Sequence, residues 1–174
     1  MDGKLIFDIV KMSSNCEKEK KEKLTAHTQD VVDLCTELVR KFTDQHSDIQ
    51  ETLLINAAYL HDVARFKNGK DGHHKKDCVK KVIGDLVPEG EEYEAVLEII
   101  KQHRKGFNPQ RYIWESAILR LCDKLDKFSK EEDAEEKCHE AFALFEKCGE
   151  FSSTDLLQIY AVYLKKRAEL LKLR

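Results

Sequence analysis

The chain has 174 residues, of which 36% are charged and 41% are hydrophobic, and its formal net charge is −3. This length and composition predict one folded domain over residues 1–174 and exclude a disordered chain. Charges of both signs are mixed along the chain, so nothing in the sequence indicates a nucleic-acid duplex or a membrane surface as a partner. The pattern carries no signal for an oligomeric state.

No apolar run reaches the roughly 18 residues of a membrane-spanning helix. Four charged residues interrupt the N-terminal stretch where a signal peptide would need an apolar core, namely Asp2, Lys4, Asp8 and Lys11. A cytoplasmic location is therefore expected. The six cysteines form no Cys-x-x-Cys pair, so in a reducing compartment we expect buried free thiols rather than disulfides.

The sequence predicts an all-α fold, because apolar residues recur at helical spacing and no alternating strand pattern is present. Glycines and the two prolines fall between the helical segments. The expected helices lie near residues 2–12, 18–45, 48–65, 72–86, 90–104, 111–129, 132–147 and 154–172. Ser152 stands three residues before Asp155, which indicates a capping box at the start of the last helix.

The stretch AAYLHDVAR, residues 57–65, ends an apolar run with two adjacent polar residues. Residues four apart share a helix face, so His61 continues the stripe of Ala57 and Asp62 continues that of Ala58. We therefore expect both polar side chains to point into the core rather than to solvent.

Other predicted helices repeat this anomaly. Four more polar residues continue apolar stripes, namely His27, His74, His103 and Asp123. The remaining histidines, His46, His73 and His139, fit such stripes poorly or lie at a helix end, and we interpret them as surface residues.

A single inward histidine or aspartate is usually satisfied by a neighbouring hydrogen-bond partner or counter-ion. Burying an ionised carboxylate is costly unless a partner compensates it, and here two carboxylates are expected beside four histidines. A shared divalent cation would compensate both carboxylates and accept neutral imidazoles. The pattern therefore favours a site for a divalent ion, of Mn, Fe, Co, Ni, Zn or Mg, over separate local solutions.

In this arrangement the chain resembles the HD-domain metal-dependent phosphohydrolase superfamily, whose signature is a His, a His-Asp pair and a later Asp. The matching residues are His27 in LTAHTQDVVDLC, His61-Asp62 in AAYLHDVAR and Asp123 in ILRLCDKLDKF. The resemblance covers about residues 20–130, and helices over 132–172 are expected to pack on this core. It implies a single-domain, all-α helical bundle with the metal site between helices.

The chain also resembles a subgroup with two extra histidines before the last aspartate, which in related families hold a second metal. GHHKKDCVKKVI supplies His74, with His73 as the alternative, and VLEIIKQHRKG supplies His103. Some related enzymes carry two adjacent histidines at the later position, where this chain has Gln102 and His103.

The resemblance implies hydrolysis of a phosphate mono- or diester, expected to be a nucleotide, with a metal-activated water as nucleophile. In this interpretation, four residues hold the first ion: His27, His61, Asp62 and Asp123. Asp62 would also bridge to a second ion held by His74 and His103.

Cationic side chains are expected to complete a phosphate site. Arg65 follows His61 by one helical turn and is the first candidate, with Lys124 and Arg104 as further ones. The last two fit an ordinary surface charge equally well. Asp126, three residues after Asp123, is interpreted as a partner that supports a ligand.

Three other functions fit the same residues. The first is a one-metal nucleoside monophosphate nucleotidase, in which His74 and His103 bind phosphate or transfer protons. The second is a non-catalytic sensor that binds a nucleotide or a metal. The third is a helical interaction module whose polar residues are satisfied locally.

Overall fold

The computed structural model describes residues 1–42, 48–68, 76–103 and 111–127, together with ten single positions between 143 and 168. Within these residues the chain forms helices and no strand, which confirms the predicted all-α fold. The helices of the continuous ranges are α1 (Gly3–Met12), α2 (Lys18–Phe42), α3 (Glu51–Leu60), α4 (Arg65–Asn68), α5 (Lys76–Ile83), α6 (Glu91–Gln102) and α7 (Ile113–Lys127). None of these helices is long and apolar enough to cross a lipid bilayer.

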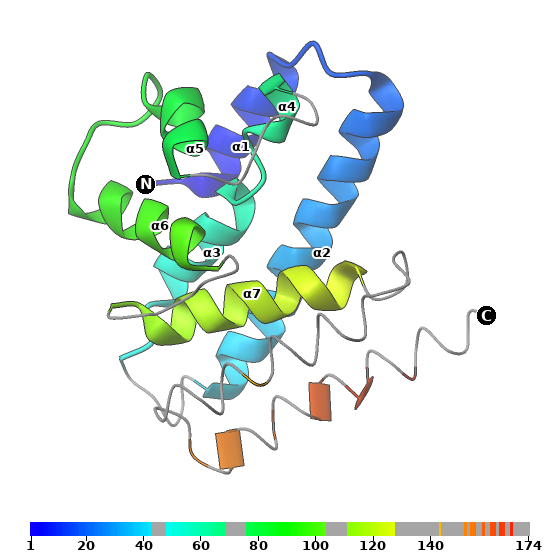
Figure 1. Ribbon diagram of the computed structural model, residues 1–174, viewed down its shortest axis with the longest axis vertical. Coiled ribbons are helices and arrows are strands. Elements are labelled where there is room, and N and C mark those ends of the chain that lie inside the picture. Colours follow the sequence, from blue (N-terminus) through cyan, green and yellow to red (C-terminus); the bar gives the residue numbers. More distant parts are fainter. Residues whose placement is uncertain are drawn as a thin grey trace.

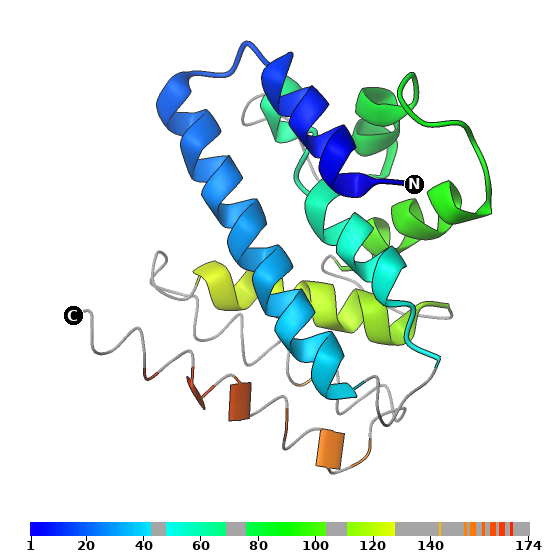
Figure 2. The same ribbon diagram turned by 180° about the vertical axis from the view of Figure 1, so that it is seen from behind.

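The short helix α3 lies at the centre of the described bundle. It packs against α1, α2, α6 and α7, and α2 also packs against α7. Figure 1 shows α7 running across α2 and α3, and Figure 2, from behind, shows α1, α2 and α3 in front of α7. A residue on α3 can therefore meet side chains from helices that are far apart in the sequence.

The composition of α3 suits this central position. Leu54, Ala57, Ala58 and Leu60 are fully buried, and the burial of Ala57 and Ala58 confirms the predicted inward stripe. Complete burial of one leucine side chain contributes about 1.5–3 kcal/mol relative to exposure. The two alanines add little bulk, so the backbones of neighbouring helices can approach this part of α3 closely.

The predicted helix over 48–65 is wrong at its C-terminal end, because α3 stops at Leu60 and a turn separates it from α4. His61 Nδ1 donates a hydrogen bond to the Ala58 carbonyl oxygen, 2.7 Å away. In a continued helix that carbonyl would accept the backbone N–H of Asp62. A side chain that takes the carbonyl competes with the helix, and the next hydrogen bonds span three residues, as from Arg65 N to Asp62 O.

The same kind of side-chain hydrogen bond lies at the end of α6. This helix was predicted to reach residue 104 and ends at Gln102. His103 is the C-cap residue, and its Nδ1 donates to the carbonyl oxygen of Ile100, three residues earlier. In both helices the histidine is the first residue after the last helical turn. The C-terminal ends of α3 and α6 therefore lie directly beside the imidazoles that follow them.

The ten isolated positions lie in the predicted C-terminal helices or beside them. Eight positions between 154 and 168 are helical. Asp155 N lies 3.2 Å from Ser152 Oγ, and Ser152 N donates to the Asp155 carboxylate, which confirms the capping box. Val162 is buried in the core, and Lys165 pairs with Glu37 of α2. The helix predicted over 132–147 otherwise lies outside the described residues.

Four cysteines lie in the described part of the chain, and all are free thiols, as expected. Cys35 of α2 and Cys122 of α7 are fully buried, whereas Cys16 and Cys78 are half-buried. Burial is the largest of the effects that raise the pKa of the Cys122 thiol, followed by its contact with Cys35. Cys35 and Cys122 thus act as small apolar residues where α2 meets α7.

Helix α1 is fixed to α3 by a close backbone approach. Gly3 N donates to Asn56 Oδ1 at 2.9 Å, and Asn56 Nδ2 donates to the Met1 carbonyl oxygen at 3.1 Å. The absence of a side chain on Gly3 allows this approach, because a Cβ there would lie 2.8 Å from Asn56 Cα. The start of α1 thereby packs directly against one side of α3.

Replacing Gly3 with Ala is expected to lower the free energy of unfolding by about 1–3 kcal/mol, because the added methyl group meets backbone that cannot yield. The measurement is urea denaturation followed by circular dichroism. Met12→Ala is the matched control on the same helix, because Met12 is 81% exposed, and it should change stability by less than about 0.5 kcal/mol. A Gly3→Ala protein more stable than the parent, as helix propensity alone would give, would contradict this packing.

Candidate metal centre

Three buried side chains from separate parts of the chain point their ligand atoms at one place. His27 comes from α2, His61 from the end of α3 and Asp123 from α7, and one ligand atom of each lies within 4.8 Å of the other two. The two Nε2 atoms are 3.2 Å apart, and Asp123 Oδ1 is 3.3 Å from His27 Nε2 and 3.9 Å from His61 Nε2. Residues 96 positions apart in sequence, His27 and Asp123, thus meet because α2 packs against α7.

Both histidines are oriented through their second ring nitrogen. His27 Nδ1 lies 2.6 Å from Asp126 Oδ2, and His61 Nδ1 lies 2.7 Å from the Ala58 carbonyl oxygen. An acceptor at Nδ1 places a proton on that nitrogen, so Nε2 is the nitrogen that can bind a metal when it carries no proton. Hydrogen bonds of this kind characterise metal-binding histidines, and the pairing with Asp126 agrees with its interpretation as a supporting residue.

The surrounding charges act differently on the two imidazoles. Burial lowers the pKa of His27, but hydrogen bonds to Asp123 and Asp126, with the nearby carboxylate charges, outweigh burial and raise that pKa to about 9. For His61 the effect of burial is the largest, and its pKa is lowered. At neutral pH His27 is therefore the site's imidazolium and His61 its neutral imidazole. A cation at this place is electrostatically favourable.

Asp62 lies at the edge of this cluster. Its Oδ2 is 3.6 Å from His27 Nε2 and 3.9 Å from His61 Nε2, and its side chain is 1% exposed. The prediction that His61 and Asp62 both point inward is confirmed by their burial. Asp62 Oδ2 also accepts a hydrogen bond from Arg65 Nη1 at 2.6 Å, so this oxygen faces the histidines and a guanidinium together.

His103 lies beside His61 and not on the surface. The two rings are 5.7 Å apart between centroids and meet edge-on, and His103 is 4% exposed. With its Nδ1 donating to the Ile100 carbonyl oxygen, His103 is oriented as His61 is. Its predicted role as a ligand of a second ion stays a prediction, but the structure places it next to the cluster.

Two of the three cations predicted to bind phosphate lie next to site carboxylates. Arg65 pairs with Asp62, and Lys124 Nζ lies 2.8 Å from Asp123 Oδ2. Their side chains are 33% and 24% exposed, so each lies between the buried carboxylates and the protein surface. Catalytic roles for Asp62, Arg65 and Lys124 stay predictions. His74, the alternative His73 and Arg104 lie outside the described residues.

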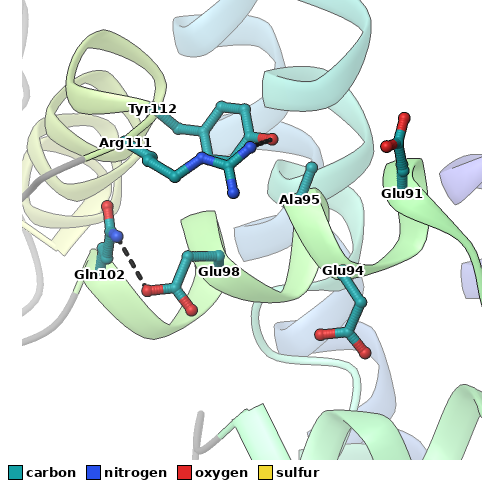
Figure 3. Close-up of a pocket in the computed structure, with 7 residues that line it drawn as sticks. All are labelled: Glu91, Glu94, Ala95, Glu98, Gln102, Arg111 and Tyr112. Carbon is teal, nitrogen blue, oxygen red and sulfur yellow. Dashed lines mark hydrogen bonds between the residues drawn. The ribbon is translucent and has the colours of Figure 1, made fainter.

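Gln102, at the position where some related enzymes have a histidine, turns away from the cluster. Its Nε2 donates to Glu98 at 2.9 Å, and its Oε1 accepts from Ser116 of α7 at 3.1 Å. Gln102 lines a cavity of about 480 Å³, and Figure 3 shows it there with Glu98 and Arg111. Gln102 therefore ties α6 to α7 and leaves His103 as the inward residue of the pair.

No pattern in the sequence indicates the backbone groups of the site. The carbonyl groups of Ala58 and Ile100 orient two imidazoles, and any residue type can supply a carbonyl. The C-terminal ends of α3 and α6 also carry the partial negative charge of the helix dipole, which favours a nearby cation. Only the position at which each helix stops could have indicated these groups.

The donor set fits a divalent metal ion. Two oriented imidazoles and a carboxylate, all buried and converging, match the ligands that Mn, Fe, Co, Ni and Zn accept in proteins. The absence of a cysteine from this cluster of described residues sets it apart from a closed structural zinc site. The cluster could thus hold an ion and leave coordination positions for water or substrate.

Comparison with protein-family models matches the HD domain over residues 24–144. Comparisons with curated proteins and with solved structures give no match. Proteins of the HD family bind divalent metals and are generally metal-dependent phosphohydrolases. The match covers more than half of the chain and includes every residue of the cluster, so this chain belongs to the HD domain family.

Proposed function

We propose that this protein is a metal-dependent phosphohydrolase that hydrolyses a phosphate mono- or diester, with a nucleotide as the expected substrate. The observation that carries the proposal is the buried meeting of His27, His61 and Asp123, with both imidazoles oriented through Nδ1. A helical interaction module would not need three ligand atoms aimed at one point. Membership of the HD family supports the same reaction class.

His27, His61, Asp62 and Asp123 would hold the first ion. His103, next to His61, would contribute to a second, together with the predicted His74. The mixture of imidazole and carboxylate ligands favours Mn, Fe, Co, Ni or Zn over Mg, because Mg prefers oxygen ligands and retains water. When bound, such an ion supplies a water whose pKa falls from 15.7 to about 7 and neutralises phosphate oxygens.

The chain's own residues prepare this chemistry. The Asp126 carboxylate accepts a hydrogen bond from His27 Nδ1. This contact turns His27 Nε2 toward the cluster. Asp62 and Asp123 are buried carboxylates, which provide negative charge where an ion would bind. Arg65 and Lys124, partly exposed beside them, would bind the anionic phosphate and orient it for attack.

The reaction class is tested with Asp123→Asn, which keeps the side-chain volume but removes a ligand charge. We expect at least about a hundredfold loss of hydrolysis of a chromogenic phosphate ester and of nucleotide esters, because ligand loss removes metal-dependent activation of water. Bound metal is measured on the same samples by elemental analysis. Asp77→Asn is the matched control, because Asp77 is an exposed carboxylate on α5.

Unchanged metal content and unchanged activity in Asp123→Asn would contradict the proposal. Tight binding of a nucleotide and of Mn²⁺ without turnover in the parent protein would instead support a non-catalytic sensor.

His103→Ala distinguishes one metal from two. If His103 holds a second ion, the variant should bind one ion fewer per chain at saturating Mn²⁺, with the first site intact. Equilibrium dialysis with metal analysis measures the stoichiometry. Unaltered stoichiometry with altered kinetics would indicate a one-metal nucleotidase, in which His103 contacts phosphate or transfers a proton.

Binding of a divalent ion is expected to release about one proton per chain at pH 7, since His27, with its pKa raised to about 9, must give up its proton to ligate. The lowered pKa of His61 means that this residue adds none. Affinity for Mn²⁺ should therefore rise about tenfold per pH unit between pH 6.5 and 8.5 and level off near pH 9. Titration calorimetry in buffers of different ionisation enthalpy counts the proton.

Asp126→Asn provides the check on this assignment, because it removes one of the contacts that raise the pKa of His27. In that variant the affinity should level off at a lower pH. An affinity that does not change with pH in the parent protein would show that His27 is not a ligand.

A further inference from the structure

Two of the carboxylates beside the imidazoles, Asp62 and Asp123, each pair with a basic side chain, but the two pairs use their carboxylate oxygens differently. Asp123 separates its two contacts. Its Oδ1 lies 3.3 Å from His27 Nε2, whereas Lys124 Nζ lies 2.8 Å from the other oxygen, Oδ2. Lys124 thus neutralises and orients Asp123 without touching the oxygen that faces the imidazoles.

Asp62 brings both contacts to one oxygen. Its Oδ2 is 3.6 Å from His27 Nε2 and 3.9 Å from His61 Nε2, and the same Oδ2 accepts the 2.6 Å hydrogen bond from Arg65 Nη1. Charge-assisted hydrogen bonds of this length are among the strong ones in proteins. The guanidinium therefore holds the same Asp62 oxygen that faces the imidazoles.

The local fold makes this pair. Arg65 follows Asp62 by three residues in the turn after α3. Arg65 N donates to the Asp62 carbonyl oxygen at 2.9 Å, which brings the two residues together. Asp62 is 1% exposed and Arg65 is 33% exposed. The buried carboxylate thus has a counter-ion whose side chain reaches in from the surface.

Resting on the proposed function, we propose that Arg65 is a positioning residue that competes with the divalent ion for Asp62 Oδ2, whereas Lys124 assists ion binding by orienting Asp123. An ion that binds Asp62 must displace the guanidinium or share the oxygen with it. Displacement would free the guanidinium for the phosphate group of a substrate. Arginine stays charged at all pH values relevant to proteins, so this competition is distinct from the proton on His27.

The test is the affinity of the full chain for Mn²⁺, measured by competition with a chelating dye at fixed pH. Arg65→Met should bind Mn²⁺ about tenfold more tightly or better, because loss of one strong charge-assisted bond is worth about that factor or more. Arg65→Gln should also bind more tightly, and Arg65→Lys should restore affinity toward that of the parent. Lys124→Met should bind equally or more weakly.

Lys124→Met is the matched control for charge, because it removes one cation from the same site. If removal of any nearby positive charge were the cause, Lys124→Met would tighten binding as much as Arg65→Met does, and the inference would be overturned. Lys67→Met, an exposed residue of α4, should leave the affinity unchanged. If Arg65→Met fails to fold, Arg65→Gln carries the test.

The outcomes separate this inference from the proposed function. A parent protein that binds no divalent ion would overturn both. A parent protein that binds Mn²⁺, with Arg65→Met and Arg65→Gln no tighter than the parent, would overturn the competition alone. Tighter binding in both variants together with a larger thermal stabilisation by Mn²⁺ than in the parent would support it.

Discussion

The burial of three carboxylates beside two imidazoles is the constraint on which the rest of this structure depends. Asp62, Asp123 and Asp126 are each at most 5% exposed, and an ionised carboxylate in such surroundings must be compensated. Arg65, Lys124 and the imidazolium of His27 supply the positive charge. Each of these three cations lies beside a buried carboxylate. His61, whose pKa is lowered, is the neutral imidazole of the cluster.

The helix ends serve the same constraint. A histidine that hydrogen-bonds a carbonyl at the end of its own helix has its ring oriented by that bond. It also lies beside the negative end of the helix dipole. His61 and His103 both do this, from α3 and from α6. The two helices pack against each other, so their ends and their imidazoles come together. The predicted helix through residue 65 would place the Arg65 backbone differently relative to Asp62.

The charge balance of the site connects its stability to its proposed chemistry. Side chains that compensate buried carboxylates also compete with any ion that those carboxylates would bind. This competition takes two forms, a proton at His27 and a guanidinium at Arg65. Lys124 differs because it pairs with the outward oxygen of Asp123. A site of this kind can fold around its own counter-charges and exchange some of them for a metal.

Helical periodicity by itself determined the all-α fold and the inward direction of His27, His61, Asp62, His103 and Asp123, because residues three and four apart share a face. It did not determine where α3 and α6 stop, because that depends on a side chain taking a backbone carbonyl. It also left open the partner of each carboxylate oxygen. His27 meets Asp126 across 99 positions of sequence, and only the packing of α2 on α7 brings such atoms to hydrogen-bonding distance.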